Sequence, residues 1–97
     1  MQQLNSLQDP FGFDLFVSVE VYEEIIQSLA GLYFQLWFAE QNKPLPLRNS
    51  DFAAECLKKS RQIRALRRNY KLHQIAERDE ASEHYAKELK TVRATYF

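Results

Sequence analysis

The stretch from Leu32 to Phe38 constrains the fold most, since six of its seven residues are large and apolar. It lies inside a longer segment, residues 19–39, whose apolar residues recur at helical spacing. On a helical projection these residues share one arc, roughly 160° wide. They are Val21, Tyr22, Ile25, Ile26, Leu29, Leu32, Tyr33, Leu36 and Trp37. We therefore expect an amphipathic helix whose apolar arc forms the core.

Two phenylalanines depart from this pattern. Phe34 and Phe38 lie one turn apart on the otherwise polar side of the predicted helix. Two interpretations are open. A third element of the same chain covers them, or they form an exposed patch that binds a partner, because exposed apolar clusters mark interaction sites.

The N-terminal part of the sequence has a different period. Apolar residues alternate with mostly polar ones from Phe11 to Val19, which is the pattern of a strand. No second strand-like run exists in the sequence, and a lone strand cannot complete a sheet. The sequence therefore predicts an extended aromatic arm over residues 1–17, which lies over the helices or pairs with a strand of another chain. Its Phe13 and Leu15 are candidate partner-binding residues.

Two helices are expected after the arm, and the first contains the amphipathic segment described above. The first covers 18–41 with Ser18 as N-cap, a loop with two prolines covers 42–49, and a second helix with Ser50 as N-cap covers 50–75. The second helix carries an apolar stripe that Lys59 interrupts by turning its charge outward. This stripe consists of Phe52, Cys56, Ile63, Leu66 and Tyr70.

The last segment, residues 76–97, begins with charged residues and then resumes a helical apolar stripe. Either the chain bends within residues 77–82 and returns, or one long helix projects and packs on another chain. In both cases the fold is all-α, an antiparallel helical hairpin with a C-terminal helical extension or third helix, in a single small domain. The stripe consists of Ala81, Tyr85, Leu89, Val92 and Tyr96.

Composition excludes several classes of protein. The lone Cys56 cannot form an internal disulfide and is expected in the core, and the chain shows neither a signal peptide nor an apolar run long enough to span a membrane. We expect a cytoplasmic protein without a membrane partner. The 13 basic and 13 acidic residues balance, but the first half is acidic and the second half is basic.

Catalytic and metal-binding chemistry have little support. With two glycines there is no phosphate-binding loop, and no nucleophile lies at a useful spacing from a base. Glu80 and His84 form the one helical pair suited to a metal, beside Asp79 and Glu83, but charged helix faces contain such pairs by chance. We expect no enzyme activity, no cofactor and no metal.

The strongest chemical signal is a basic run, residues 58–71, with seven cations and no acid. On one continuous helix, five of these cations would share roughly 120° of arc. The face is either solvated or paired with the acids of the first helix, or it binds a protein through Arg64 and Arg68, or it binds nucleic-acid phosphates. The nucleic-acid candidates are Arg61, Arg64, Arg67, Arg68 and Lys71.

These features favour non-enzymatic binding. We expect a small regulator, adaptor or inhibitor that docks on a larger protein through its exposed aromatic and arginine-rich surfaces. In size and composition the chain is similar to small phage and plasmid accessory proteins that act on host enzymes, an analogy of build alone. Because the apolar surface exceeds what two helices can hide, self-association into a homodimer is the alternative to a foreign partner.

Overall fold

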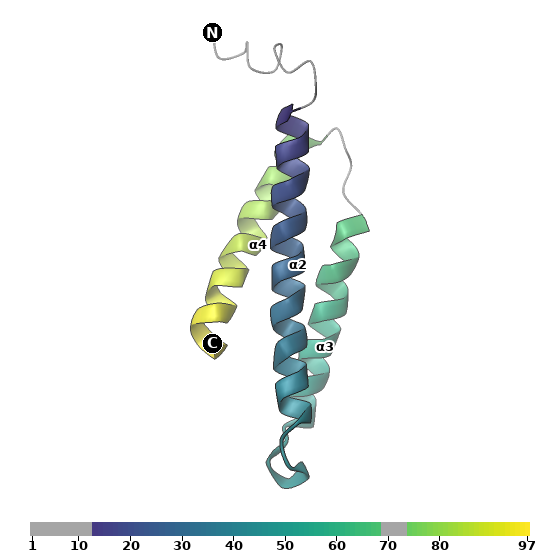
Figure 1. Cartoon of the computed structure of the whole chain (residues 1–97), viewed down its shortest axis with the longest axis vertical. Helices are drawn as coiled ribbons and strands as arrows, with labels where there is room; N and C mark the ends of the chain where they lie inside the picture. The colour runs from purple at the N-terminus through teal and green to yellow at the C-terminus, as the bar shows by residue number, and fades with distance from the viewer. Residues whose placement is uncertain (1–12, 69–73) are drawn as a thin grey trace.

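The computed structural model describes residues 13–68 and 74–97. In this part of the chain there are three α-helices, α2 (Phe13–Gln41), α3 (Ser50–Ala65) and α4 (Ile75–Tyr96), and two short 3₁₀ turns, η1 (Leu45–Leu47) and η2 (Leu66–Arg68). The long α2 lies between α3 and α4 and packs on both (Figure 1). The helices alternate in direction along the chain, so that α2 and α4 run the same way. The predicted all-α fold, a hairpin with a third helix, is confirmed.

The extended arm was wrong for the residues that the structure describes. α2 begins at Phe13, so residues 13–17 are helical, and residues 1–12 lie outside the described part. The alternating pattern also fits a helix, because Phe13, Phe16 and Val17 recur at helical spacing. Ser18 is therefore no N-cap. It is buried inside α2, where its hydroxyl donates to Asp79 Oδ1 of α4 at 2.7 Å.

The core forms where the apolar arc of α2 meets the other two helices, as predicted. Ile26, Leu29 and Ala30 are fully buried, Ile63 joins them from α3, and Val92 joins them from α4. Partly buried side chains surround this centre. They are Leu32, Tyr33, Leu36, Leu66, Ala81, Tyr85 and Leu89.

The second helix is much shorter than the predicted 50–75. Asn49, not Ser50, is its N-cap, and the Asn49 side chain accepts the backbone N–H of Phe52. α3 ends at Ala65, where the chain tightens into η2. The Tyr22 hydroxyl of α2 donates to the carbonyl of Leu66 at 3.1 Å and so satisfies a backbone group at this helix end.

The last segment bends and returns, which decides between the two predicted arrangements. The bend comes earlier than residues 77–82, because α4 is already helical from Ile75. A polar link then joins all three helices: Tyr33 Oη donates to Glu88 Oε2 at 2.6 Å, and Lys59 Nζ lies 3.7 Å from the same oxygen. Lys59 therefore turns toward α4 rather than simply outward.

Candidate partner-binding surfaces

Phe34 and Phe38 are exposed, as the partner-patch interpretation requires. Their exposed fractions are 40% and 56%. The half-buried Trp37 lies between them, with its ring 5.1 Å from that of Phe34 and 6.5 Å from that of Phe38. We call these three residues the aromatic patch. α3 and α4 pack on other sides of α2, because the core residues of α2 occupy the opposite arc.

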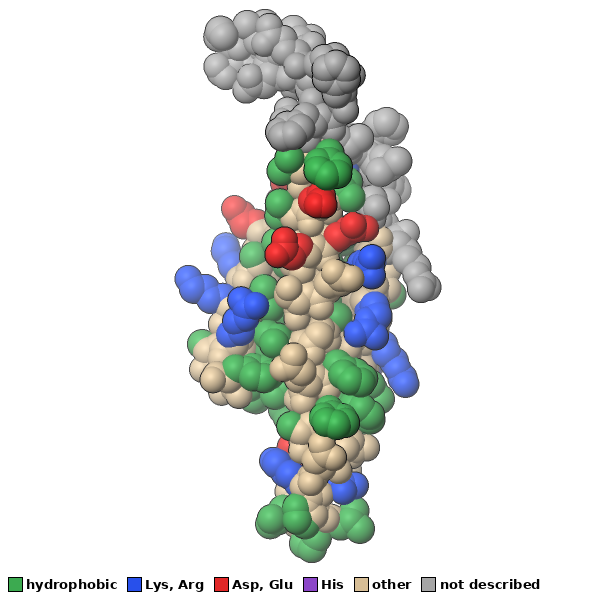
Figure 2. Space-filling model, in the orientation of Figure 1, with side chains coloured by type: hydrophobic (Ala, Val, Ile, Leu, Met, Phe, Trp, Pro, Cys, Tyr) green, Lys and Arg blue, Asp and Glu red, His purple; other side chains and the backbone are tan. Residues whose placement is uncertain are grey.

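The loop after α2 continues this apolar surface to the end of the hairpin. Leu45 and Leu47, which flank Pro46 in η1, are the most exposed large apolar residues in the described part, at 75% and 71%. Figure 2 shows apolar side chains gathered at this end of the molecule. From the sequence this segment was predicted only as a connecting loop, and the exposure of its two leucines was missed.

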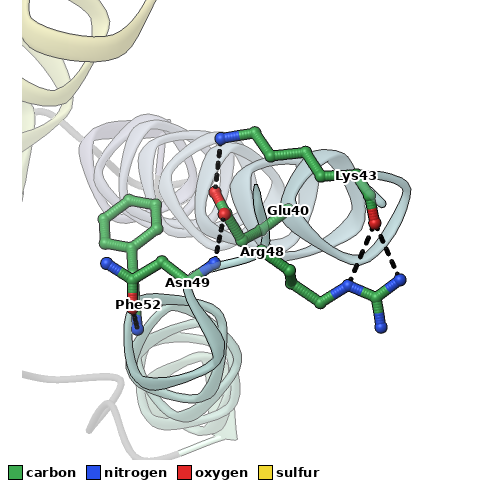
Figure 3. Close-up of polar contacts among 5 residues, drawn as sticks. All are labelled: Glu40, Lys43, Arg48, Asn49 and Phe52. Carbon is green, nitrogen blue, oxygen red and sulfur yellow. Dashed lines mark hydrogen bonds and ion pairs between the residues drawn. The ribbon is translucent and has the colours of Figure 1, made fainter. Parts of the chain in front are cut away.

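The loop has a fixed conformation because Glu40 closes it. The Glu40 carboxylate accepts the backbone N–H of Asn49 at 2.7 Å through Oε2 and pairs with Lys43 Nζ at 3.0 Å through Oε1 (Figure 3). The hydrogen bond from Asn49, followed by Lys43, lowers the pKa of Glu40. On the other side of the loop, the Arg48 guanidinium donates twice to the carbonyl of Lys43, at 2.8 and 3.2 Å. η1 therefore presents its leucines from a closed frame.

The predicted basic face is only partly assembled. Arg61 and Arg64 on α3 and Arg67 in η2 are exposed, and none of the three forms an ion pair with a described residue. The Arg68 side chain and all of Lys71 lie outside the described residues. α3 ends at Ala65 and Arg67 lies in η2, so Arg61, Arg64 and Arg67 do not share one continuous α-helix. The predicted arc of roughly 120° also includes the Arg68 side chain and Lys71, and that part of it lies outside the described residues.

A second group of cations was missed. Lys87, Lys90 and Arg93 are exposed on the second half of α4, whose first half carries acids. Figure 2 shows basic side chains on both sides of α2, over α3 and over α4, with acids nearer the end where α2 begins. Lys87, Lys90 and Arg93 are spaced three residues apart in the sequence, and this spacing could have revealed the group.

Two predicted partner-binding residues belong to the segment that was expected to form an arm. Phe13 and Leu15 lie in the first turns of α2, and their side chains are outside the described part. The next apolar residues, Phe16 and Val17, are exposed at 59% and 42%.

Cys56, His84 and Asp79 were among the side chains considered for catalysis or metal binding. Cys56 is buried on α3, as expected, and burial raises the pKa of its thiol. His84 is exposed and lies edge-on to the ring of Tyr85 at 4.8 Å, while Asp79 accepts from Ser18. Among residues 13–68 and 74–97, no three His, Cys, Asp or Glu side chains gather closely enough to hold a metal ion.

Within the same ranges, no helix is both long and apolar enough to cross a membrane. The chain matches no protein-family model, and comparisons with curated proteins and with solved structures found no significant similarity. The function proposed below is therefore based on the exposed apolar and basic surfaces of this chain.

Proposed function

We propose that the protein is a non-enzymatic binding protein, a small regulator, adaptor or inhibitor, that docks on a larger protein. The observation that supports this proposal is the exposure of Phe34 and Phe38 beside Trp37. Aromatic side chains are enriched in the buried centres of protein interfaces, where they exclude water and fill pockets. The leucines of η1 extend this surface to the hairpin end. Arg64, exposed in the last turn of α3, would be a separate charged contact.

The frame around η1 supports the same function. Ordering a loop on binding reduces affinity, and a loop that is already ordered avoids this penalty. Glu40 and Arg48 hold η1 in one conformation by side-chain contacts to backbone atoms of Asn49 and Lys43. The proposal includes action in the cytoplasm, which fits a free thiol at Cys56.

The decisive experiment is a capture from source-cell lysate with the intact chain and with a Phe34→Ser, Phe38→Ser variant. We expect the variant to keep its helical circular dichroism and lose the captured protein. Gln62→Ser, an exposed change on α3 away from the aromatic patch, is the control and should capture normally. A captured protein that the double variant retains would count against the aromatic patch, and a collapse of the variant's thermal midpoint would assign both residues to the core.

The second candidate is nucleic-acid binding, which Arg61, Arg64 and Arg67 favour, because all three are exposed and form no ion pair with the described residues. Phosphate contacts from such arginines would not depend on the aromatic patch. Capture with and without nuclease treatment separates the two candidates, because a protein partner survives the nuclease.

A further inference from the structure

The side of α2 that faces away from α3 and α4 has an ordered pattern. Apolar residues stand at its two ends, and acidic, polar and small residues stand between them. On a helical projection all of them fall within roughly 100° of arc. We call this set the outer face: Phe16, Val17, Glu20, Glu24, Gln27, Gly31, Phe34, Gln35 and Phe38.

Gly31 on the outer face makes no contact in the described part of the chain that would require a glycine. A Cβ built at this position meets nothing within 4 Å. Glycine is the least favourable non-proline residue in a helix interior, so an unneeded glycine at this position weakens α2. A side chain of one hydrogen is useful there if the backbone of another helix approaches the outer face closely, since small residues permit such contact.

Charge divides the same surface into two halves. Glu20 and Glu24 lie on the first half of the outer face. Cations of both neighbouring helices lie level with the second half of the outer face. The contact of Tyr33 with Glu88 places Lys87 and Lys90 of α4 level with the aromatic patch. The contact of Ser60 with the carbonyl of Ala30, at 2.9 Å, places Arg61 of α3 at the middle of α2. Figure 2 shows basic side chains on both sides of α2.

We propose that the outer face pairs with the outer face of a second copy of this chain, antiparallel, about a two-fold axis near Gln27. Gln27 is the midpoint of α2, Phe13–Gln41. An interface with two-fold symmetry must be self-complementary. The outer face meets this requirement, because the axis brings its apolar ends together and places its acidic half against the half that lies level with cations. Each residue meets the one equally far from Gln27 on the partner copy, so Phe38 of one copy packs against Phe16 of the other. The two copies of Gly31 lie about one turn on either side of the axis, where the backbones approach.

The same symmetry brings unlike charges together. Glu20 of one copy comes level with Phe34 of the other, and Glu24 comes level with Ala30. Both carboxylates then come level with cations of the neighbouring helices, Lys90 of α4 and Arg61 of α3. A parallel pairing would instead align the acidic halves with each other, which repulsion disfavours.

The outer face contains Phe34 and Phe38 of the aromatic patch, so a regulatory role for this dimer rests on the proposed function. The second copy covers Phe34 and Phe38, so a larger partner must displace it. The dimer is then the form of the protein that exists without its partner.

Disulfide cross-linking tests the pairing. In a Cys56→Ser background, Gln27→Cys places two thiols at the axis, where their Cα atoms fall within disulfide reach. We expect mild oxidation to give a covalent dimer. The control is Gln62→Cys, exposed on α3 away from the outer face, which should stay monomeric. Equal cross-linking of both variants, or none of Gln27→Cys, would overturn the pairing.

Light scattering of the uncross-linked chain gives the second readout. We expect a dimer whose dissociation constant rises about tenfold or more in Glu20→Lys with Glu24→Lys, as cations then meet cations. A monomer at all concentrations, or a dimer that the double variant leaves unchanged, would contradict the inference. A monomer that still captures a larger protein through Phe34 and Phe38 would overturn the dimer alone. A dimer that captures nothing would overturn the proposed function alone.

Discussion

The Glu40 carboxylate accepts the backbone N–H of Asn49 at 2.7 Å, which joins the last turn of α2 to the residue that caps α3. Glu40 is one of the few buried charged residues in the described part, and its side chain is 7% exposed. A buried carboxylate is stable only when its oxygens are satisfied, and here Asn49 and Lys43 satisfy them. The hairpin turn is thus fixed by a residue outside the turn itself.

We expect Glu40→Gln to lower the thermal midpoint and to make it less dependent on pH. The pKa of Glu40 is lowered in the folded chain from its ordinary value of 4.5, mainly by the hydrogen bond from Asn49. Its ionised form therefore stabilises the fold fully above that value, and the stabilisation is lost as the pH falls through the lowered pKa.

Melting curves at about pH 7 and about pH 3 check this prediction. The difference in midpoint between the natural chain and Glu40→Gln should narrow at the acidic pH. Glu83→Gln, at an exposed position on α4 outside the loop, is the control. A gap that stays the same at both pH values would show that charge on Glu40 contributes nothing to the turn.

Alkaline pH should weaken the link between the three helices. Burial, and then the hydrogen bond to Glu88, raises the pKa of Tyr33 well above its ordinary value of 10.0. A raised pKa means that Tyr33 stabilises the fold below pH 10 and that this contribution is lost as the pH rises beyond it. Tyr33→Phe should remove about 1 kcal/mol of stability near neutral pH. Denaturant titrations near neutral pH and above pH 10.0 measure the unfolding free energy of the two chains. A Tyr33→Phe chain whose stability depends on pH as strongly as that of the natural chain would contradict the prediction.

The sequence predicted the core well because burial of apolar surface decides it. The helical period of α2 identified Ile26 and Leu29, and the stripe of α4 identified Val92, all of which are buried. The sequence also placed Phe34 and Phe38 outside the apolar arc but left open whether another element covers them, and both are exposed. Only Val21, at one edge of that arc, is exposed at 45%.

Helix ends were predicted poorly because local propensity sets them weakly. No proline or glycine marks the end of α3 at Ala65. The change of charge was the overlooked signal. Cations up to Lys71 suit the C-terminal end of one helix, and acids from Glu77 suit the start of the next, because of the helix dipole. At the other end of the chain, alternation suggested a strand where a helix forms, since a short apolar run fits both periods.

The buried centre of the core should be far more sensitive to truncation than the hairpin end. Leu29 is 0% exposed, so Leu29→Ala should cost about 2–5 kcal/mol of unfolding free energy. Leu45→Ala is a matched control, because the same side chain is 75% exposed at that position. It should change the unfolding free energy by less than about 0.5 kcal/mol. A destabilisation by Leu45→Ala similar to that by Leu29→Ala would mean that η1 belongs to the core.

The nucleic-acid candidate predicts a steep dependence of affinity on salt. If Arg61 and Arg64 contact phosphates, binding should weaken strongly between about 50 and 200 mM salt, since each contact releases counterions. Arg61→Glu with Arg64→Glu should abolish the complex, and Lys87→Glu, at an exposed position on α4, should leave most of it. Absence of any gel shift at about 50 mM salt would exclude this candidate.

Gly31→Ala should have opposite effects on the single chain and on its self-association. The added methyl group meets no atom within 4 Å, so it introduces no clash inside the chain. Alanine favours the helix over glycine by up to about 1 kcal/mol, so the unfolding midpoint of the diluted, monomeric chain should rise. The same methyl group stands where two outer faces would approach, so the dimer should weaken. Denaturant melts at low concentration and light scattering at high concentration measure the two effects separately. A variant that gains stability and keeps its dimer would move the contact away from Gly31, and one that loses stability would show that α2 itself needs the glycine.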